Sequence, residues 1–311
     1  MKLAVLDLGT NTFHLLIAKV NPDHSFEILF RNRAVVKLGK GGISENRIAD
    51  APFKKGIKTI QHFNEQIKKL GNNKIFAFAT SAIRSSTNGG EFVKKVKNET
   101  GIEIKIISGD EEAELIYYGV RQCVQMDERP ALIMDIGGGS TEFIIANHTT
   151  VFWKQSFNIG AARLIDQFHL SDPILNKEMI SIQRHLEKVL QPLNAAMDKF
   201  PVSKLIGSSG SFDTLAEMTS FRFRKRNMLK AKTSYQFNLV EYDKIHKWLL
   251  KSTTQMRMKA KGLIKMRVDM IVASSICTTY VLKKFMLKEM VQSKYALKEG
   301  ALWKIIQYSI S

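Results

Sequence analysis

Two segments of the chain share a pattern in which an apolar run leads to an aspartate and then to a turn of glycine and hydroxyl residues. The first reads AVLDLGTNTF at 4–13, and the second reads LIMDIGGGSTEF at 132–143. An apolar run that ends in such a turn is typical of a buried strand. The anchoring acids Asp7 and Asp135 are 128 residues apart, so we interpret the segments as the starts of two domains related by internal duplication.

The elements expected around these turns alternate between strands and helices. In the first half, strands are expected at 3–8, 13–20, 26–38, 74–80 and 102–108, and helices at 53–70, 91–99 and 113–124. In the second half we expect strands at 130–136, 143–148 and 150–159, a strand running into a Gly/Ser turn at 203–211, and helices at 162–168, 174–199, from 212 on and over most of 240–290. This order predicts an α/β fold with largely parallel sheets.

The turn after the second aspartate is suited to binding an anion. Three glycines at 137–139 let backbone amides approach a ligand closely and form an anion-binding nest, and Ser140 adds a hydroxyl donor. Asp135 would repel an anion, so a divalent cation or a water is expected between the two, and Glu142 is expected to serve the same ion. The sequence therefore predicts a site for phosphate and Mg²⁺ or another divalent cation.

Two further turns offer similar donors. The turn Gly-Thr-Asn-Thr at 9–12 repeats the arrangement with Asp7 as its acid, and GSSGS at 207–211 is a third donor-rich turn. Neither GxxxxGK[ST] nor a GxGxxG that opens a helix occurs in the chain. The pattern therefore excludes the ordinary mononucleotide and dinucleotide loops.

Five motifs occur in an order that is similar to one known family. They are DLGTNTFHLLIA at 7–18, ATSAIR at 79–84, ISGDEEAELIYYGV at 107–120, MDIGGGSTEF at 134–143 and LKEGAL at 297–302. Together they resemble the exopolyphosphatase / guanosine pentaphosphate phosphatase (Ppx/GppA) family in its short, two-domain form. The resemblance covers residues 1 to about 302 and rests mainly on ISGDEEA and DIGGGSTE.

The resemblance implies two ribonuclease H-like domains of the actin-like ATPase superfold, with the active site in the cleft between them. We expect an N-terminal domain at 1–124, with the closing helix 300–311 packed back on it. A C-terminal domain is expected at 125–299, with a basic helical part at 221–290. The implied activity is Mg²⁺-dependent release of terminal phosphate from inorganic polyphosphate.

Two residues are expected to carry the hydrolysis. Arg84 follows a strand, and its planar guanidinium suits phosphate. Glu112 lies beside an apolar stripe, which should desolvate its carboxylate, raise its pKa and make it a general base. The resemblance points to the same glutamate. Its neighbour Glu111 has a structural explanation, because Ser108 and Glu111 have the spacing of a capping box.

The predicted site has three parts. The catalytic residues are Glu112 and Arg84, and the metal ligands are Asp7, Asp135 and Glu142. The phosphate-binding residues are Gly9, Thr10, Asn11, Gly137, Gly138, Gly139, Ser140, Gly210 and Ser211.

Some positions depart from the family pattern. Glu114 stands where an arginine is common and is expected to weaken polyanion affinity. Lys298 also replaces a common arginine, so it keeps the charge but lacks the bidentate guanidinium. Ser211 stands where a threonine is usual. These departures bear on substrate preference more than on reaction type. His14 and His169 are expected to be packed or exposed rather than catalytic, because neither has a paired acid or metal spacing.

Positive charge is concentrated in one part of the chain. The net charge is +18, and residues 221–267 hold 14 Lys and Arg against two acids, Glu241 and Asp243, which gives that stretch +12. A field of one sign attracts polyanions. A nucleic-acid partner is disfavoured because no recognised binding module accompanies the charge. The stretch is therefore expected to guide polyphosphate.

Location and alternatives complete the expectations. Cys123 and Cys277 form no CxxC pair, no secretory signal is visible, and the apolar run at 270–282 is too short for a bilayer, so we expect a reduced cytoplasmic protein without a membrane partner.

A second copy of the chain is a candidate partner. The main alternative activity is hydrolysis of the 5′-terminal phosphate of pppGpp. A non-catalytic sensor of polyphosphate or nucleotides and a sugar-kinase-type use of ATP also stay open.

Overall fold

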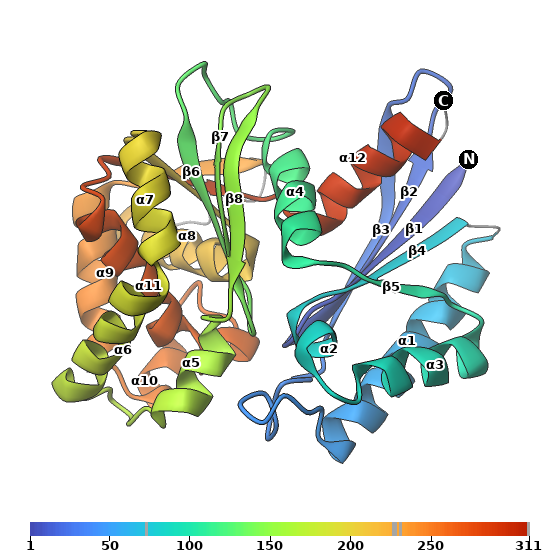
Figure 1. Ribbon diagram of the computed structural model, residues 1–311, viewed down its shortest axis with the longest axis horizontal. Helices are drawn as coiled ribbons and strands as arrows, with labels where there is room; N and C mark the ends of the chain where they lie inside the picture. The colour runs from blue at the N-terminus through green and yellow to red at the C-terminus, as the bar shows by residue number, and fades with distance from the viewer. Residues whose placement is uncertain (72–73, 226–228, 230–231, 310–311) are drawn as a thin grey trace. The chain divides into compact units, whose positions relative to one another are not determined.

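The computed structural model describes residues 1–71, 74–225, 229 and 232–309 (Figure 1). Contacts divide the chain into two units, one made of Met1–Gly119 with the chain from Leu297 on, and the other of Val120–Ala296. The sequence predicted this division at 124/125. Arg226 and Lys230 of the basic stretch, and residues 310 and 311 of the closing helix, lie outside the described residues.

The first unit is built on a five-stranded sheet with the order β3-β2-β1-β4-β5. Its strands are β1 (Lys2–Leu8), β2 (Thr12–Val20), β3 (Phe26–Val35), β4 (Lys74–Ala79) and β5 (Ile104–Ile106). β1, β2 and β3 form an antiparallel meander, whereas β1, β4 and β5 are parallel. The carboxyl ends of these three parallel strands therefore lie at one edge of the sheet.

Helices cover both faces of this sheet. The helices of the unit are α1 (Asp50–Lys69), α2 (Ser81–Ser85), α3 (Gly89–Thr100), α4 (Gly109–Val120) and α12 (Leu297–Ser309). Apolar residues of α1, α2 and α3 share one core with β1, β2 and β4, while α12 packs on β1 and β2 (Figure 1). Gly300 of α12 lies directly against the backbone of α4 at Leu115 and Gly119, where a Cβ atom would overlap it.

The second unit repeats the strand order of the first. Its sheet runs β10-β11-β9-β6-β7-β8, with β6 (Ala131–Ile136), β7 (Thr141–Ala146), β8 (Val151–Phe157), β9 (Lys204–Ser208), β10 (Ser234–Gln236) and β11 (Glu289–Ser293). β6, β7 and β8 form the antiparallel meander, and β6, β9 and β11 are parallel. The expected α/β fold class, with two domains of repeated topology, is confirmed.

The helices of the second unit gather on one face of its sheet (Figure 1). They are α5 (Ala161–Phe168), α6 (Asn176–Val189), α7 (Gln191–Lys199), α8 (Ser209–Arg224), α9 (Leu239–Lys251), α10 (Thr254–Lys259), the 3₁₀ helix η1 (Lys265–Arg267) and α11 (Ile271–Lys284). None of the helices in the described part of the chain is long and apolar enough to cross a membrane.

The duplication extends to the turns. Asp7 and Asp135 are each the penultimate residue of the first strand of their unit. In the first unit the Gly9 amide donates to Thr12 O at 3.2 Å, and in the second the Gly137 amide donates to Ser140 O at 3.0 Å. Both units thus close the same turn with the same hydrogen bond.

Several sequence predictions of secondary structure are corrected. Both sheets are mixed rather than largely parallel, because each central parallel strand carries an antiparallel meander on one side. The region 240–290 was expected to be mostly helical, but β11 begins at Glu289, since Met290 and Val291 fill a place beside β9 that only the assembled sheet offers. The helix expected from 113 begins at Gly109, where the Ser108 and Glu111 capping box starts it.

A buried histidine makes the second unit sensitive to acid. His246 of α9 is 7% exposed, its Nδ1 lies 3.1 Å from Ser275 Oγ of α11, and burial lowers its pKa from 6.5 to about 4. The unfolded chain takes up this proton below pH 6.5, whereas the folded chain does not until about pH 4. Stability therefore falls as the pH drops through this window.

We expect this group to remove about 3 kcal/mol of unfolding free energy between pH 7 and pH 4. Urea unfolding of wild type and His246→Phe across this range measures it, because the variant cannot titrate there and should show a shallower pH dependence. His62→Gln, at an exposed histidine of α1, serves as the control and should keep the wild-type slope. Equal slopes for wild type and His246→Phe would contradict the prediction.

Candidate functional site

The glycine turn of the second unit is held from behind by the start of α5. The carbonyl of Gly137 accepts from the Ala161 amide at 3.0 Å, and that of Gly138 accepts from the Ala162 and Arg163 amides at 2.9 and 3.1 Å. The Gly139 carbonyl accepts from the Gly160 amide at 3.3 Å and from Arg163 Nε at 3.1 Å. The amides that a helix start leaves without partners are thus used to fix the turn.

This arrangement decides where the amides of the turn point. In a trans peptide the N–H lies opposite the preceding C=O, so the amides of Gly138, Gly139 and Ser140 are directed away from α5. Within the described residues these three amides donate no backbone hydrogen bond outside the sheet ladder. Consecutive amides oriented in this way suit an anion, and binding of phosphate to them stays a prediction.

Gly160 is required for the close contact between α5 and the turn. A Cβ atom at this position would lie 2.5 Å from the backbone carbons of Gly138 and Gly139. Any side chain at 160 would therefore push the turn out of place. Gly160 and Arg163 were not among the predicted site residues, although a glycine two positions before the helix predicted at 162–168 was an available signal.

Two predicted metal ligands lie side by side in the second sheet. Asp135 of β6 is directly opposite Glu142 of β7, so their side chains share one face. On one side the row extends to Ser208 of β9, whose hydroxyl donates to Asp135 Oδ2. On the other side it extends to Ser156 of β8, whose hydroxyl donates to Glu142 Oε1 at 2.6 Å. A polar row thus crosses four strands next to the glycine turn.

These acids fit a hard divalent cation. Asp135 is 6% exposed and Glu142 is 1% exposed, and two neighbouring buried carboxylates call for a positive charge nearby. Mg²⁺ typically takes one or two protein carboxylates and completes its shell with water and substrate phosphate. Among the described residues, no group of three or more His, Cys, Asp or Glu side chains is arranged to hold a metal. Asp7, the third predicted ligand, belongs to the other unit.

GSSGS, expected to be a turn, forms the end of β9 and the start of α8 at the same edge of this sheet. The Ser211 hydroxyl is buried, lies 3.0 Å from Ser274 Oγ and donates to Ile136 O at 3.4 Å, so it fastens the turn to the core. Its predicted contact with phosphate stays a prediction. Gly210 lies directly under the Arg267 guanidinium, where a Cβ atom would overlap the side chain. The sequence gave no reason to single out Arg267 among the 14 cations of its stretch.

In the first unit, the turn after β1 also has its carbonyls fixed from one side. Asn11 O accepts from the amides of Val36 and Lys37 at 3.0 and 2.9 Å, and Thr10 O accepts from the Gly39 amide at 3.2 Å. Asn11 Nδ2 and Thr12 Oγ1 are buried and have no hydrogen-bond partner among the described residues. Polar atoms of this kind suit a polar ligand, because burying them without a partner is costly.

The adjacent strand β4 delivers further polar groups to the same edge. Its register with β1 places Ala79 beside Leu8, so α2 begins next to the turn. Ser81, the first residue of α2, is 2% exposed, and its hydroxyl has no partner within the described chain. The turn at 9–12, Ser81 and Arg84 therefore lie at the carboxyl ends of neighbouring parallel strands, where α/β sheets usually bind ligands.

The two predicted catalytic residues contact each other. Arg84 Nη1 lies 2.7 Å from Glu112 Oε2 and also donates to Ile107 O at 3.1 Å. Glu112 is 7% exposed, which agrees with the expected burial beside the apolar stripe of α4. The expected rise in its pKa stays a prediction. The structure adds that Arg84 fixes the orientation of this carboxylate.

Neighbouring residues of α4 have structural partners. Ser108 and Glu111 form the expected capping box, with their reciprocal bonds at 3.1 and 3.0 Å. Glu114, which departs from the family pattern, pairs with Lys304 of α12 at 2.7 Å. This cation offsets the negative charge that was expected to weaken polyanion affinity. Lys298, the second departure, lies 3.3 Å from Glu299.

Two histidines were set aside by the sequence analysis. His14 was expected to have no paired acid. This is wrong, because the register of β1 and β2 places His14 directly opposite Asp7. The sequence could not show this pairing, which depends on the length of the turn between the strands. His169 adopts a left-handed conformation, with φ 47°, at the end of α5.

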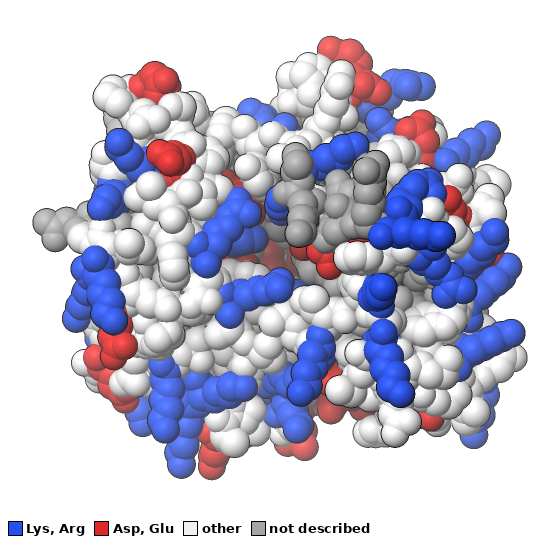
Figure 2. Space-filling view, turned by 180° about the vertical axis from the view of Figure 1, so that it is seen from behind, with Lys and Arg blue, Asp and Glu red and all other residues white. Residues whose placement is uncertain are grey.

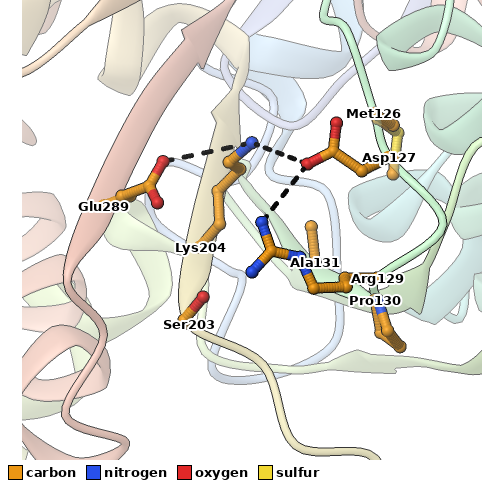
Figure 3. A pocket seen from close by; sticks show the side chains of 8 residues that line it. All are labelled: Met126, Asp127, Arg129, Pro130, Ala131, Ser203, Lys204 and Glu289. Carbon is orange, nitrogen blue, oxygen red and sulfur yellow. Dashed lines mark ion pairs between the residues drawn. The ribbon is translucent and has the colours of Figure 1, made fainter.

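A pocket occurs at the opposite edge of the second sheet (Figure 3). It lies where β6, β9 and β11 begin, whereas the glycine turn and GSSGS follow their carboxyl ends. Lys204 in this pocket lies 4.0 Å from both Asp127 and Glu289. Because its charged groups pair with one another and it is far along the strands from the turns, it is not part of the candidate site.

Comparison with known proteins agrees with these features. The model of the Ppx/GppA phosphatase family matches residues 16–309. An exopolyphosphatase from Cytophaga hutchinsonii with a known crystal structure is 38% identical in sequence to this chain. The two structures match with a TM-score of 0.95 over 99% of this chain and 98% of that one. The Ppx/GppA family member from Aquifex aeolicus is 23% identical, with a TM-score of 0.80 over 100% of this chain and 99% of that one, which supports the fold.

A longer protein also contains a related region. The bifunctional 3-dehydroquinate synthase/phosphatase of Fusobacterium nucleatum is 30% identical over 290 residues. The match takes in 91% of this chain but 43% of that protein, so the chain spans less than half of that relative's length.

Proposed function

Because the chain belongs to the Ppx/GppA phosphatase family, we propose that it is an exopolyphosphatase that releases orthophosphate from the end of inorganic polyphosphate. The observation that carries the proposal is the glycine turn of the second unit. Its carbonyls are held by α5, and its amides point the other way, where they can donate to a phosphate. A nest of fixed amides binds the oxygens of a phosphate without selecting any organic group attached to it.

The second unit is assigned to binding. The amides of 138–140 would hold phosphate oxygens, and Arg267, which lies over Gly210, would add a cation. Asp135 and Glu142 would hold Mg²⁺. The metal would neutralise charge on the phosphoryl group, which is a main requirement of phosphoryl transfer.

The first unit is assigned to activating water. Glu112 takes a proton from the attacking water as the water oxygen bonds to the terminal phosphorus. The bridging P–O bond then breaks, and the shortened chain leaves with its electron pair. Arg84 holds the Glu112 carboxylate in place and offers its remaining N–H groups to phosphate. Asn11, Thr12 and Ser81 supply buried polar atoms that suit further phosphate oxygens.

Hydrolysis of pppGpp would use the same groups, so substrates must be compared directly. We expect the purified chain with Mg²⁺ to release phosphate from polyphosphate faster than from pppGpp, and EDTA to abolish release until Mg²⁺ is restored. Asp135→Asn keeps the shape of the side chain but removes its charge, so it should need more Mg²⁺ for half-maximal rate. Faster release from pppGpp would establish the alternative activity, and release from neither would favour the sensor.

A further inference from the structure

One exposed segment of the second unit carries several positive charges and leads away from GSSGS. Residues 257–267 contain five Lys and Arg and no acid. Lys259, Lys261 and Lys265 are exposed, and none of them forms an ion pair with a described residue. Other cations of the basic stretch are paired, such as Arg224 with Glu241 and Lys247 with Asp243, each within 2.7 Å.

The segment is firmly attached at its first end. Arg257 is 5% exposed, donates to Asp172 Oδ1 at 2.8 Å and donates through Nε to Val268 O at 3.0 Å. Its guanidinium is therefore used inside the protein and does not face solvent. Because Arg257 ties α10 to Val268, the lysines between these residues are presented on a fixed backbone.

The segment then runs along α8 toward the phosphate-binding turn. Gly262 lies against the backbone of α8 at Glu217 and Met218, where a Cβ atom would come within 2.6 Å. Further on, Arg267 covers Gly210 in the first turn of the same helix. Seven residues of α-helix span about 10 Å, so the segment places Arg267 over Gly210 and places Gly262, with Lys261 beside it in the chain, about that far along the helix.

We propose that Lys259, Lys261 and Lys265 form an outer subsite that binds the distal phosphates of a long polyphosphate chain. The inference rests on the proposed function and deepens it, because these cations can contact only a substrate that extends beyond the turn. Lys and Arg outnumber Asp and Glu on the face of the molecule shown in Figure 2, in line with a net charge of +18. This segment differs from the other basic parts of the surface because its backbone is held along α8, starting near the turn.

The composition of the segment favours polyphosphate over nucleic acid. Single-stranded nucleic acid is usually held by aromatic side chains that stack on its bases, interleaved with cations. Residues 251–267 contain no Phe, Tyr or Trp. Polyphosphate has no bases and needs only a row of cations, which the segment supplies.

The test compares long polyphosphate with tripolyphosphate, which is too short to reach Lys261 and Lys259 from the turn. In the variant Lys259→Gln/Lys261→Gln/Lys265→Gln, we expect the ratio of kcat/KM for the long chain to that for tripolyphosphate to fall about tenfold at low salt, mainly through KM. The difference should shrink as salt is raised, because salt screens exposed charges. The matched control Lys177→Gln/Lys188→Gln/Lys199→Gln removes three exposed lysines from α6 and α7 and should keep the wild-type ratio.

Each outcome has a distinct meaning. An unchanged ratio in the outer-lysine variant, with wild type active on polyphosphate, overturns the outer subsite and leaves the proposed function standing. Equal losses in the outer-lysine variant and the control also overturn it, since net charge alone would then explain the effect. Inhibition by single-stranded RNA that depends on these lysines, with an unchanged ratio, assigns the surface to nucleic acid. No phosphate release from any polyphosphate by wild type is a failure of the proposed function itself.

Discussion

Replacing Glu112 by glutamine is expected to lower the rate of phosphate release by about 10²–10⁴-fold, the usual contribution of a general base. Glutamine has the shape of glutamate and keeps an oxygen that can accept the hydrogen bond from Arg84 Nη1, which now lies 2.7 Å from Glu112 Oε2. The substitution therefore removes the base while it leaves the local packing in place. The loss should appear in kcat, with little change in KM.

Glu111→Gln is the matched control for this prediction. It makes the same change one residue away, at a carboxylate that caps α4 through Ser108 and pairs with Lys105 at 2.7 Å. Because glutamine can also complete a capping box, we expect near wild-type activity from this variant. Phosphate release with purified variants, after a check of folding by urea unfolding, measures both. Wild-type kcat in Glu112→Gln would remove Glu112 as the base.

Replacing Gly160 by alanine is expected to lower kcat/KM by about 10²-fold, although residue 160 is not assigned to any contact with substrate. The added Cβ atom would lie 2.5 Å from the backbone of Gly138 and Gly139, so the turn would have to shift. A displacement of about 1 Å in groups that position a substrate can cost this much in rate. Overpacking should also reduce the unfolding free energy by about 1–3 kcal/mol.

Gly90→Ala provides the comparison for this second prediction. Gly90 lies in α3, and a Cβ atom there would meet nothing within 4 Å. We expect this variant to keep wild-type kinetics and to gain up to about 1 kcal/mol in stability, because alanine is the better helix former. Steady-state kinetics and urea unfolding of both variants test the pair. Wild-type kcat/KM in a folded Gly160→Ala protein would show that the turn does not depend on this contact.

Much of the site could be predicted because its signals are local. A glycine turn after a buried strand shows its capacity for anions in its own residues, and Ser108 with Glu111 shows a helix start in four residues. Burial of Glu112 followed from the apolar periodicity of a single helix. The expected cytoplasmic location and a homodimer stay predictions.

Other features escaped prediction because they depend on segments far apart in the chain. Glu114 seemed to disturb the site, but its partner Lys304 is 190 residues away on α12. β11 has a weak pattern of its own and is a strand because β9 offers it an edge. Arg267 was one cation among many until the fold placed it over Gly210.

The sequence by itself determined which turns carry donors suited to phosphate, which acids accompany them, and that the chain contains the pattern twice. These properties follow from side-chain chemistry and short-range spacing, which do not change on folding. Only the tertiary structure decided the direction of the turn amides, the contact between Arg84 and Glu112, and the row that joins Asp135 and Glu142. Each of these depends on strand register or on a helix that packs against a turn, and such long-range contacts are fixed only when the whole domain assembles.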